Sequence, residues 1–381
     1  MSRFLSLFLF CFCFIIVNLF RQGPGTVYTK KKLKPKVDVT HAEKLGTIPP
    51  LRELVPVEPT SALKKQLYKK KKKGPKDFPG RGRNKVIRPE LEHQGKDAIR
   101  QKSVNASSAV IVEPLINMDG LTSGISPNDP TGDVGLDHYL QAINVTTLGV
   151  FDKEGTLLNT FDANTLWSQL GFFSAGDPIV LYDQQTNRWI ITEFPNGNQL
   201  LVAVSENADP MSSYTAYNFP TPQFPDYPKY GVWDDVITVS TNEGGPGTLS
   251  IYIMDKVALM AGADEVPIQR LELPGNTQTK AGFFVSTPLD WTGRNEPVGG
   301  PIFIAQNDAC WGLTEQDQIE VYTIDVDFAN SDNTTFDNTS VVISPFDGFP
   351  CSSTGFGFQC VPQLNGEGLD AIPEVITYQA H

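Results

Sequence analysis

The chain is poor in cysteine, and its cysteines form no recognisable metal site. Cys11 and Cys13 lie in an apolar N-terminal run, and Cys310, Cys351 and Cys360 lie far along the chain. The absence of a Cys-x-x-Cys pair or a His/Cys cluster excludes the common patterns of structural zinc. Because Cys351 and Cys360 enclose a short glycine-containing loop, we expect a disulfide between them, with two free thiols as the alternative.

The chain also lacks the signatures of common catalytic centres. It has no Gly-x-Ser-x-Gly motif, no legible Ser/His/Asp order and no glycine-rich phosphate loop before a helix. His138 is the only histidine of the chain's body apart from the terminal His381, and its place beside a strand start favours a structural hydrogen bond over a general base. Carboxylates are too numerous for a glycosidase pair to be chosen from sequence, so an acidic glycoside hydrolase or lyase stays an alternative.

Positive charge is scarce after residue 105 and concentrated before it. Residues 1–105 contain 24 Lys and Arg against 8 Asp and Glu, whereas residues 106–381 contain 7 against 35. Such an asymmetry usually means a basic tail attached to an acidic globule. The acidic part should repel nucleic acid and anionic membranes and attract cationic partners or divalent cations. We therefore expect no specific binding of nucleic acid.

One long apolar run is present, at residues 4–20, with Arg3 before it and Arg21 after it. The run predicts either a secretory signal peptide over 1–21, although no small residues mark a cleavage site, or a short uncleaved signal anchor that forms a transmembrane helix. The heavier positive charge after the run would place the tail inside, which conflicts with an exported globule. We expect a secreted or cell-surface protein, anchored in the membrane if the run is not cleaved.

Residues 22–105 show no hydrophobic periodicity and include five consecutive lysines at 69–73. A segment of this composition buries too little apolar surface to offset the entropy of ordering, so we expect a disordered basic linker. Three roles are open for it: contact with polyanions or an anionic membrane, a solvated spacer, or contact with the acidic globule.

Residues 106–381 carry the pattern of repeated small sheets. The stretch 176–219 contains four short runs rich in β-branched and aromatic residues, separated by turns such as Asn196-Gly197. A meander of this size needs neighbours of its own kind to bury both faces. Similar units recur roughly every 45–65 residues, as propeller blades do. We expect an all-β fold, a β-propeller with four to five visible blades of four-stranded antiparallel sheet that form an incomplete ring.

Several short motifs follow one another in a specific order over 126–381: Asn128-Asp129-Pro130, Gly176-Asp177-Pro178, Arg188-Trp189, Phe224-Pro225-Asp226-Tyr227-Pro228, Val232-Trp233 and Cys360-Val-Pro-Gln363. In this order they resemble a family of secreted bacterial-type β-propeller proteins of unsettled activity. Members of that family usually continue with further blades. The resemblance therefore implies a C-terminally truncated propeller domain over 106–381.

Two sets of residues are candidates for ligand binding. Asp129, Asp133 and Asp137 form the densest oxygen-rich cluster and predict a calcium site, although the spacing is not that of an EF-hand loop and each Asp could simply cap a turn. Trp291 and Trp311 lie in loop-like contexts and predict a surface for stacking on a glycan. No cofactor other than this calcium is indicated.

These observations together favour an exported or surface-attached β-propeller that acts as a non-catalytic binding or adhesion module. Glycans or surface proteins are the expected partners, because the sequence combines a repetitive scaffold with an acidic body and no readable nucleophile or metal triad.

Overall fold

A computed structural model describes residues 28–54, 114–122, 129–144, 147–243, 248–274, 285–293, 299–346, 375–377 and 379–381. The apolar run at 1–21, the Cys351–Cys360 pair and residues 55–105 lie outside these ranges. Within them, no helix is both long enough and apolar enough to cross a membrane.

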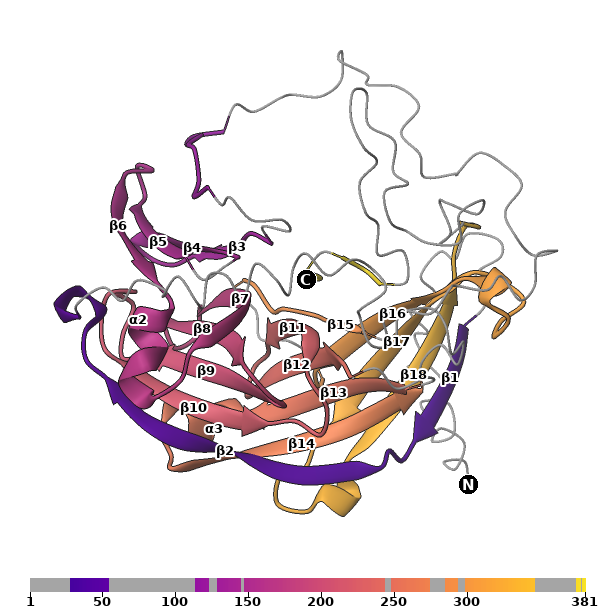
Figure 1. The fold of residues 1–381 in the computed structure, drawn as a ribbon. Coiled ribbons are helices and arrows are strands. Elements are labelled where there is room, and N and C mark those ends of the chain that lie inside the picture. The colour runs from indigo at the N-terminus through magenta and orange to yellow at the C-terminus, as the bar shows by residue number, and fades with distance from the viewer. Residues whose placement is uncertain are drawn as a thin grey trace, which may run out of the picture.

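The described chain is all-β, and its strands form three antiparallel sheets (Figure 1). The strands are β1 Tyr28–Leu33, β2 Val37–Ile48, β3 Thr131–Val134, β4 His138–Ile143, β5 Thr147–Asp152, β6 Leu157–Asp162, β7 Ser174–Asp183, β8 Arg188–Pro195, β9 Gln199–Ser205, β10 Tyr214–Pro220, β11 Asp226–Val232, β12 Val236–Asn242, β13 Thr248–Asp255, β14 Glu265–Pro274, β15 Thr287–Pro288, β16 Ile302–Asn307, β17 Gln318–Asp325 and β18 Thr335–Val342. Two short helices, α2 Asn164–Trp167 and α3 Lys256–Met260, lie in connections between strands.

Strands β3 to β18 fall into four successive four-stranded meanders. We call β3–β6, β7–β10, β11–β14 and β15–β18 the first, second, third and fourth meander. The opening strands of the four meanders lie side by side, because β3 contacts β7, β7 contacts β11 and β11 contacts β15. Since β7 and β11 are also the two ends of a nine-stranded sheet, that sheet is nearly closed.

The hydrophobic core lies between successive meanders rather than inside any one of them. On β8, Ile191 packs in a cluster with residues of the first meander, while its neighbour Ile190 packs in a cluster with residues of the third. On β13, Tyr252 packs toward the second meander and Ile251 toward the fourth. Consecutive strand residues point to opposite faces, so the second and third meanders are each buried on both sides.

The strands expected in 176–219 are confirmed as β7 to β10. The turns at 184–187 and 196–198 separate them as the sequence predicts. Runs of β-branched and aromatic side chains are buried on both faces here, so the pattern that predicts strands and the packing that stabilises them agree.

The expected disordered linker over 22–105 is wrong for residues 28–54, which we call the belt. Strand β2 lies between β10 and β14 and pairs with both, so it joins the second and third meanders into the nine-stranded sheet. Strand β1 pairs with β18 at the outer edge of the fourth meander. Ala42 and Ile48 of β2 are fully buried. A few well-placed apolar residues and two pairing edges order this segment despite its charge.

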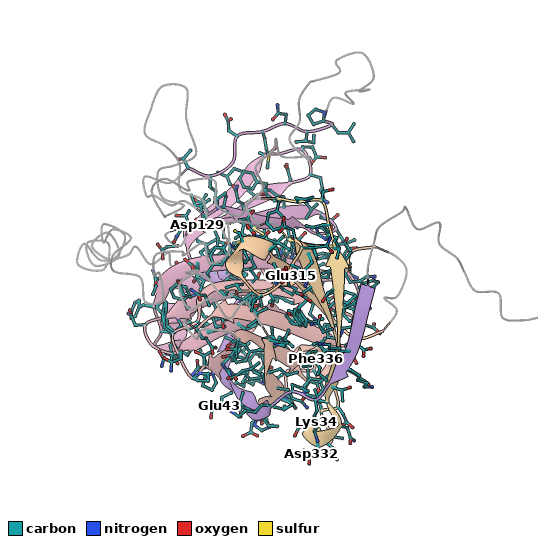
Figure 2. The ribbon with its side chains drawn as sticks, turned by 90° about the vertical axis from the view of Figure 1, so that its right-hand side faces the viewer. Lys34, Glu43, Asp129, Glu315, Asp332 and Phe336 are labelled. Carbon is teal, nitrogen blue, oxygen red and sulfur yellow. The ribbon has the colours of Figure 1, made fainter. Side chains whose placement is uncertain are left out.

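Ion pairs also connect the basic belt to the acidic body. Lys34 lies 3.7 Å from Asp332 (Figure 2), and Lys44 lies 3.9 Å from Asp264. Most of the carboxylates and amines in these pairs are exposed to water, where one pair contributes at most about 1 kcal/mol. Backbone pairing and buried apolar surface therefore stabilise the belt in its position, and the ion pairs add a smaller contribution. Of the three roles open for the basic segment, contact with the globule is the one the described part adopts.

One cross-strand pair in the belt is unfavourable and yields a prediction. Glu43 of β2 stands directly opposite Glu265 of β14, and both side chains are exposed. Like charges at opposite positions of an antiparallel pair repel. Replacing Glu265 by lysine should raise the free energy of unfolding by about 0.5 kcal/mol, measured by urea denaturation at low salt. High salt should remove the gain, and a gain that persists in high salt would contradict this cause.

Candidate functional site

The opening strands of the first three meanders share an unusual backbone feature. Asp129, Asp177 and Tyr227 each precede a proline, and their φ angles are +34°, +49° and +52°. Positive φ is uncommon for residues other than glycine and costs of order 1–3 kcal/mol, so surrounding structure must hold these residues in place. A residue with positive φ directly before a proline therefore recurs near the start of all three opening strands, which share this local backbone conformation.

Carboxylates lie close together at this end of the opening strands. Burial raises the pKa of Tyr227 to about 12, and the negative charges of Asp129, Asp177 and Asp226 add to the shift. Lys229 lies with its Nζ atom 5.3 Å from the centre of the Tyr227 ring, and burial lowers its pKa to about 8. Three aspartates therefore act electrostatically on Tyr227, and Lys229 lies beside its ring.

Two further carboxylates tie neighbouring opening strands together. The Tyr182 amide donates to Asp133 Oδ2 at 2.7 Å, and the Val232 amide donates to Asp290 Oδ1 at 2.7 Å. Burial raises the pKa of both carboxyls, that of Asp290 to about 6, while the charge of His381 lowers both. Each aspartate thus bonds to the backbone of the neighbouring meander, and His381 lies near both.

Residues 375–377 and 379–381 run beside β15 in the same direction. Leu289 and Ala380 form a parallel bridge, and the Asp290 amide donates to the Ala380 carbonyl at 2.7 Å. Lys229 Nζ donates to the Thr377 carbonyl at 2.9 Å. The opening strands and this C-terminal segment therefore share one neighbourhood.

The three aspartates predicted to bind calcium are not gathered into one site. Asp129 Oδ2 accepts from Asn144 Nδ2 at 2.8 Å, Asp133 accepts from backbone amides, and Asp137 is exposed. In the described ranges, no group of three or more His, Cys, Asp and Glu side chains is placed to hold a metal ion. The calcium expectation stays a prediction.

The two tryptophans predicted to stack on a glycan are not a surface pair. Trp311 is 3 % exposed, in a 3₁₀ turn over Ala309–Trp311 that Asp308 caps. Trp291 is half-buried and packs against the core between the third and fourth meanders. A loop-like sequence does not make a side chain exposed, so the expectation is wrong for Trp311.

A buried carboxyl and a buried ion pair carry no sequence signal. Glu193 of β8 is fully buried, and Trp167 Nε1 donates to its Oε2 at 2.5 Å. Burial raises its pKa to about 8. Lys256 and Asp183 form a buried ion pair at 3.4 Å between the second and third meanders. Both are recognisable only from the packing around them.

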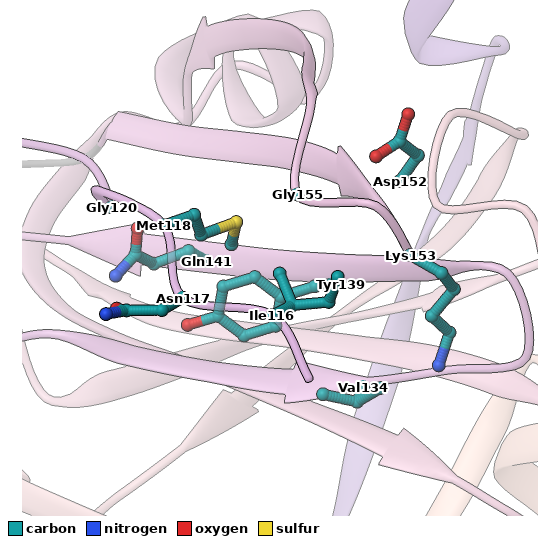
Figure 3. Close-up of a pocket in the computed structure, with 10 residues that line it drawn as sticks. All are labelled: Ile116, Asn117, Met118, Gly120, Val134, Tyr139, Gln141, Asp152, Lys153 and Gly155. Atoms are coloured by element: carbon teal, nitrogen blue, oxygen red, sulfur yellow. The ribbon is translucent and has the colours of Figure 1, made fainter. Parts of the chain in front are cut away.

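A groove lies on the outer face of the first meander, beneath residues 114–122 (Figure 3). Its volume is about 520 Å³, within the range of ligand-binding clefts. The Leu121 amide donates to Gln141 Oε1 at 2.7 Å, which fixes the covering segment to β4. The lining combines an apolar wall with amide and charged groups: Ile116, Asn117, Met118, Gly120, Val134, Tyr139, Gln141, Asp152, Lys153 and Gly155.

No protein-family model matches this chain, and the search of curated proteins finds no significant match. The resemblance to secreted bacterial-type β-propeller proteins therefore depends on the order of the motifs alone. The all-β architecture with a nearly closed sheet stands without it.

Proposed function

We propose that the chain is an exported or surface-attached β-propeller that acts as a non-catalytic binding or adhesion module. The observation that carries the proposal is the packing of four meanders face to face with their opening strands side by side. The segment at 375–381 supports it further, because it runs parallel to β15 as the opening strand of a fifth meander would. In a propeller, loops at the two ends of the ring are free to bind partners.

The surface charge favours partners with a basic surface. Of the five cations described after residue 114, Lys229, Lys256 and Arg270 are mostly buried, and Arg188 donates to the Met260 carbonyl at 3.2 Å. Lys153 is the one of the five that is exposed. Among the described residues after 114, the exposed charges are therefore almost all acidic, and such charge attracts cationic proteins and speeds their association.

A binding panel with the full chain tests this proposal. Immobilised full-length protein is offered cationic proteins, acidic proteins and neutral glycans at about 0.1 M and about 1 M salt. We expect saturable binding of cationic proteins that weakens strongly at high salt. Binding confined to glycans, or equal binding of all three classes, would argue against a charge-selected protein partner.

A glycoside hydrolase or lyase is the second candidate, and the electrostatic influence of Asp133 and His381 on Asp290 favours it. Burial raises the pKa of the Asp133 and Asp290 carboxyls above that of ordinary surface carboxylates, and enzymes shift carboxyl pKa values in this way for acid and base roles. Incubation with a panel of acidic and neutral polysaccharides tests it. Release of reducing or unsaturated ends that Asp290→Asn abolishes would replace the binding proposal; no release leaves the binding proposal in place.

A further inference from the structure

The four meanders differ in what covers their outermost strands. Strands β10 and β14 both pair with β2, and β18 pairs with β1, so the belt covers the outer edges of the second, third and fourth meanders. In the first meander, β6 is the end strand of its sheet, and no described strand pairs with its outer edge. An uncovered edge presents a row of unpaired N–H and C=O groups to any extended chain.

The β6 edge carries neither lysine nor proline, two residues that normally protect such strands, although its pairing with β5 has a register irregularity between Val150 and Phe151. Lysine and proline on an edge discourage pairing, and β1, the end strand of the fourth meander's sheet, carries the sequence Tyr-Thr-Lys-Lys-Lys-Leu. Residues 157–161 of β6 contain neither lysine nor proline nor any charge, and residues 157–160 are exposed. Leu157 is 47 % exposed and Leu158 is 52 % exposed. The β6 edge thus has no guarding lysine or proline, and its two exposed leucines offer apolar contact surface.

An apolar row leads from this edge into the groove of the first meander. Val134 is opposite Tyr139, Tyr139 is opposite Phe151, and Phe151 is opposite Leu157, so all four share one face of the sheet. The rings of Tyr139 and Phe151 are 5.7 Å apart, and Val134 is 51 % exposed. A strand added beside β6 would extend this row by one residue, next to Leu157.

We propose that β6 and the apolar row beside it bind an extended segment of a basic partner protein by strand addition. This inference rests on the proposed function and specifies its contact surface. The partner segment carries an apolar side chain next to Leu157 and lysines or arginines that face the acidic body. Main-chain hydrogen bonds to β6 supply affinity, and the side chains supply selectivity.

The belt indicates which kind of segment the β6 edge would bind. In this molecule, three outer strands already accept extended, lysine-bearing segments, with ion pairs such as Lys34–Asp332 and Lys44–Asp264 beside the pairing. The fourth outer strand belongs to the same acidic body. A second copy that offered its own β6 would be disfavoured, because two strongly acidic bodies would meet.

A labelled peptide with the sequence of residues 28–48 is the probe, added to the full chain, whose own belt covers β10, β14 and β18. We expect saturable binding by fluorescence anisotropy. Leu157→Lys should weaken it about tenfold or more, because a lysine guards the edge and repels a basic strand. Val257→Lys is the matched control, since Val257 is 66 % exposed on α3 far from β6 in the chain, and it should leave the affinity unchanged.

Two further peptides separate strand addition from simple charge attraction. A peptide with its lysines replaced by glutamate and a peptide N-methylated at alternate amides should both lose binding. Equal binding of the N-methylated peptide, or equal affinity of wild type and Leu157→Lys, would overturn the β6 site; the latter result would indicate exchange with the resident belt. If the peptide fails to bind while cationic proteins still bind the chain, the β6 inference fails and the proposed function stands.

Discussion

Replacing Ala42 by aspartate should destabilise the protein by about 3 kcal/mol or more, because it places a charge inside the nine-stranded sheet. Ala42 is fully buried in β2, opposite Val266 of β14, and belongs to the core between the second and third meanders. An ionised carboxyl there has no partner. Urea unfolding followed by circular dichroism measures the loss.

The neighbouring residue provides the control. His41 precedes Ala42 in β2 and is exposed, so His41→Asp should change the free energy of unfolding by no more than about 0.5 kcal/mol. Equal and small effects of the two variants would mean that residues 37–48 are not part of the sheet. Because both variants add one carboxylate to the belt, the comparison also separates burial from the added negative charge.

Glu193→Gln should stabilise the protein at neutral and alkaline pH and leave it nearly unchanged at acid pH. The folded state holds the proton of Glu193 up to a pKa of about 8, whereas the unfolded chain releases it near 4.5. Between these values the unfolded state binds fewer protons, so the stability of the wild type falls as pH rises, by up to about 1.4 kcal/mol per pH unit. Glutamine keeps an acceptor for Trp167 Nε1 and has no proton to lose.

Unfolding of both proteins at several pH values from 4 to 8 measures the effect. We expect the stability difference to grow with pH and to reach about 2 kcal/mol or more at pH 8. Glu206→Gln, at an exposed position of the same meander, should show no growing difference. If the Glu193→Gln protein is less stable at every pH, the Glu193 carboxyl makes a stabilising hydrogen bond that a glutamine amide cannot make, and the prediction is wrong.

The strands of the second and third meanders were predictable from sequence because their side chains carry the information locally. Ile190 and Ile191 are both buried on β8, and each faces a different neighbouring sheet. A continuous run of β-branched and aromatic residues is what burial on two faces requires. The short helix α3 begins where the Asp255 side chain accepts a hydrogen bond from the Ala258 amide.

Strands β3 and β11 were harder to predict because they contain turn-forming residues. Residues 131–134 read Thr-Gly-Asp-Val, and β11 includes Pro228 directly after Tyr227, whose φ is positive. Such residues indicate loops in isolation. Contacts with the opening strands of the neighbouring meanders override that local preference.

The belt and the buried polar groups could not be predicted because their signals depend on partners distant in sequence. Strand β2 is mostly half-exposed, and its pairing edges belong to β10 and β14, more than 150 residues away. Its charge and low hydrophobicity match those of a linker. Glu193 and the Lys256–Asp183 pair look like ordinary surface residues until the sheets pack around them.

A disulfide cross-link between β2 and β14 tests most directly whether the belt pairs with the third meander. Glu43 and Glu265 are directly opposite and exposed, so cysteines at these two positions should form a disulfide within one chain under mild oxidation, detected by mass spectrometry of the digested monomer. Cysteines at Glu43 and Glu272 lie seven residues out of register and should not. A cross-link at high yield in the first pair alone is the predicted result. Equal yields in both pairs, or none in either, would contradict a belt that pairs in this register with the third meander.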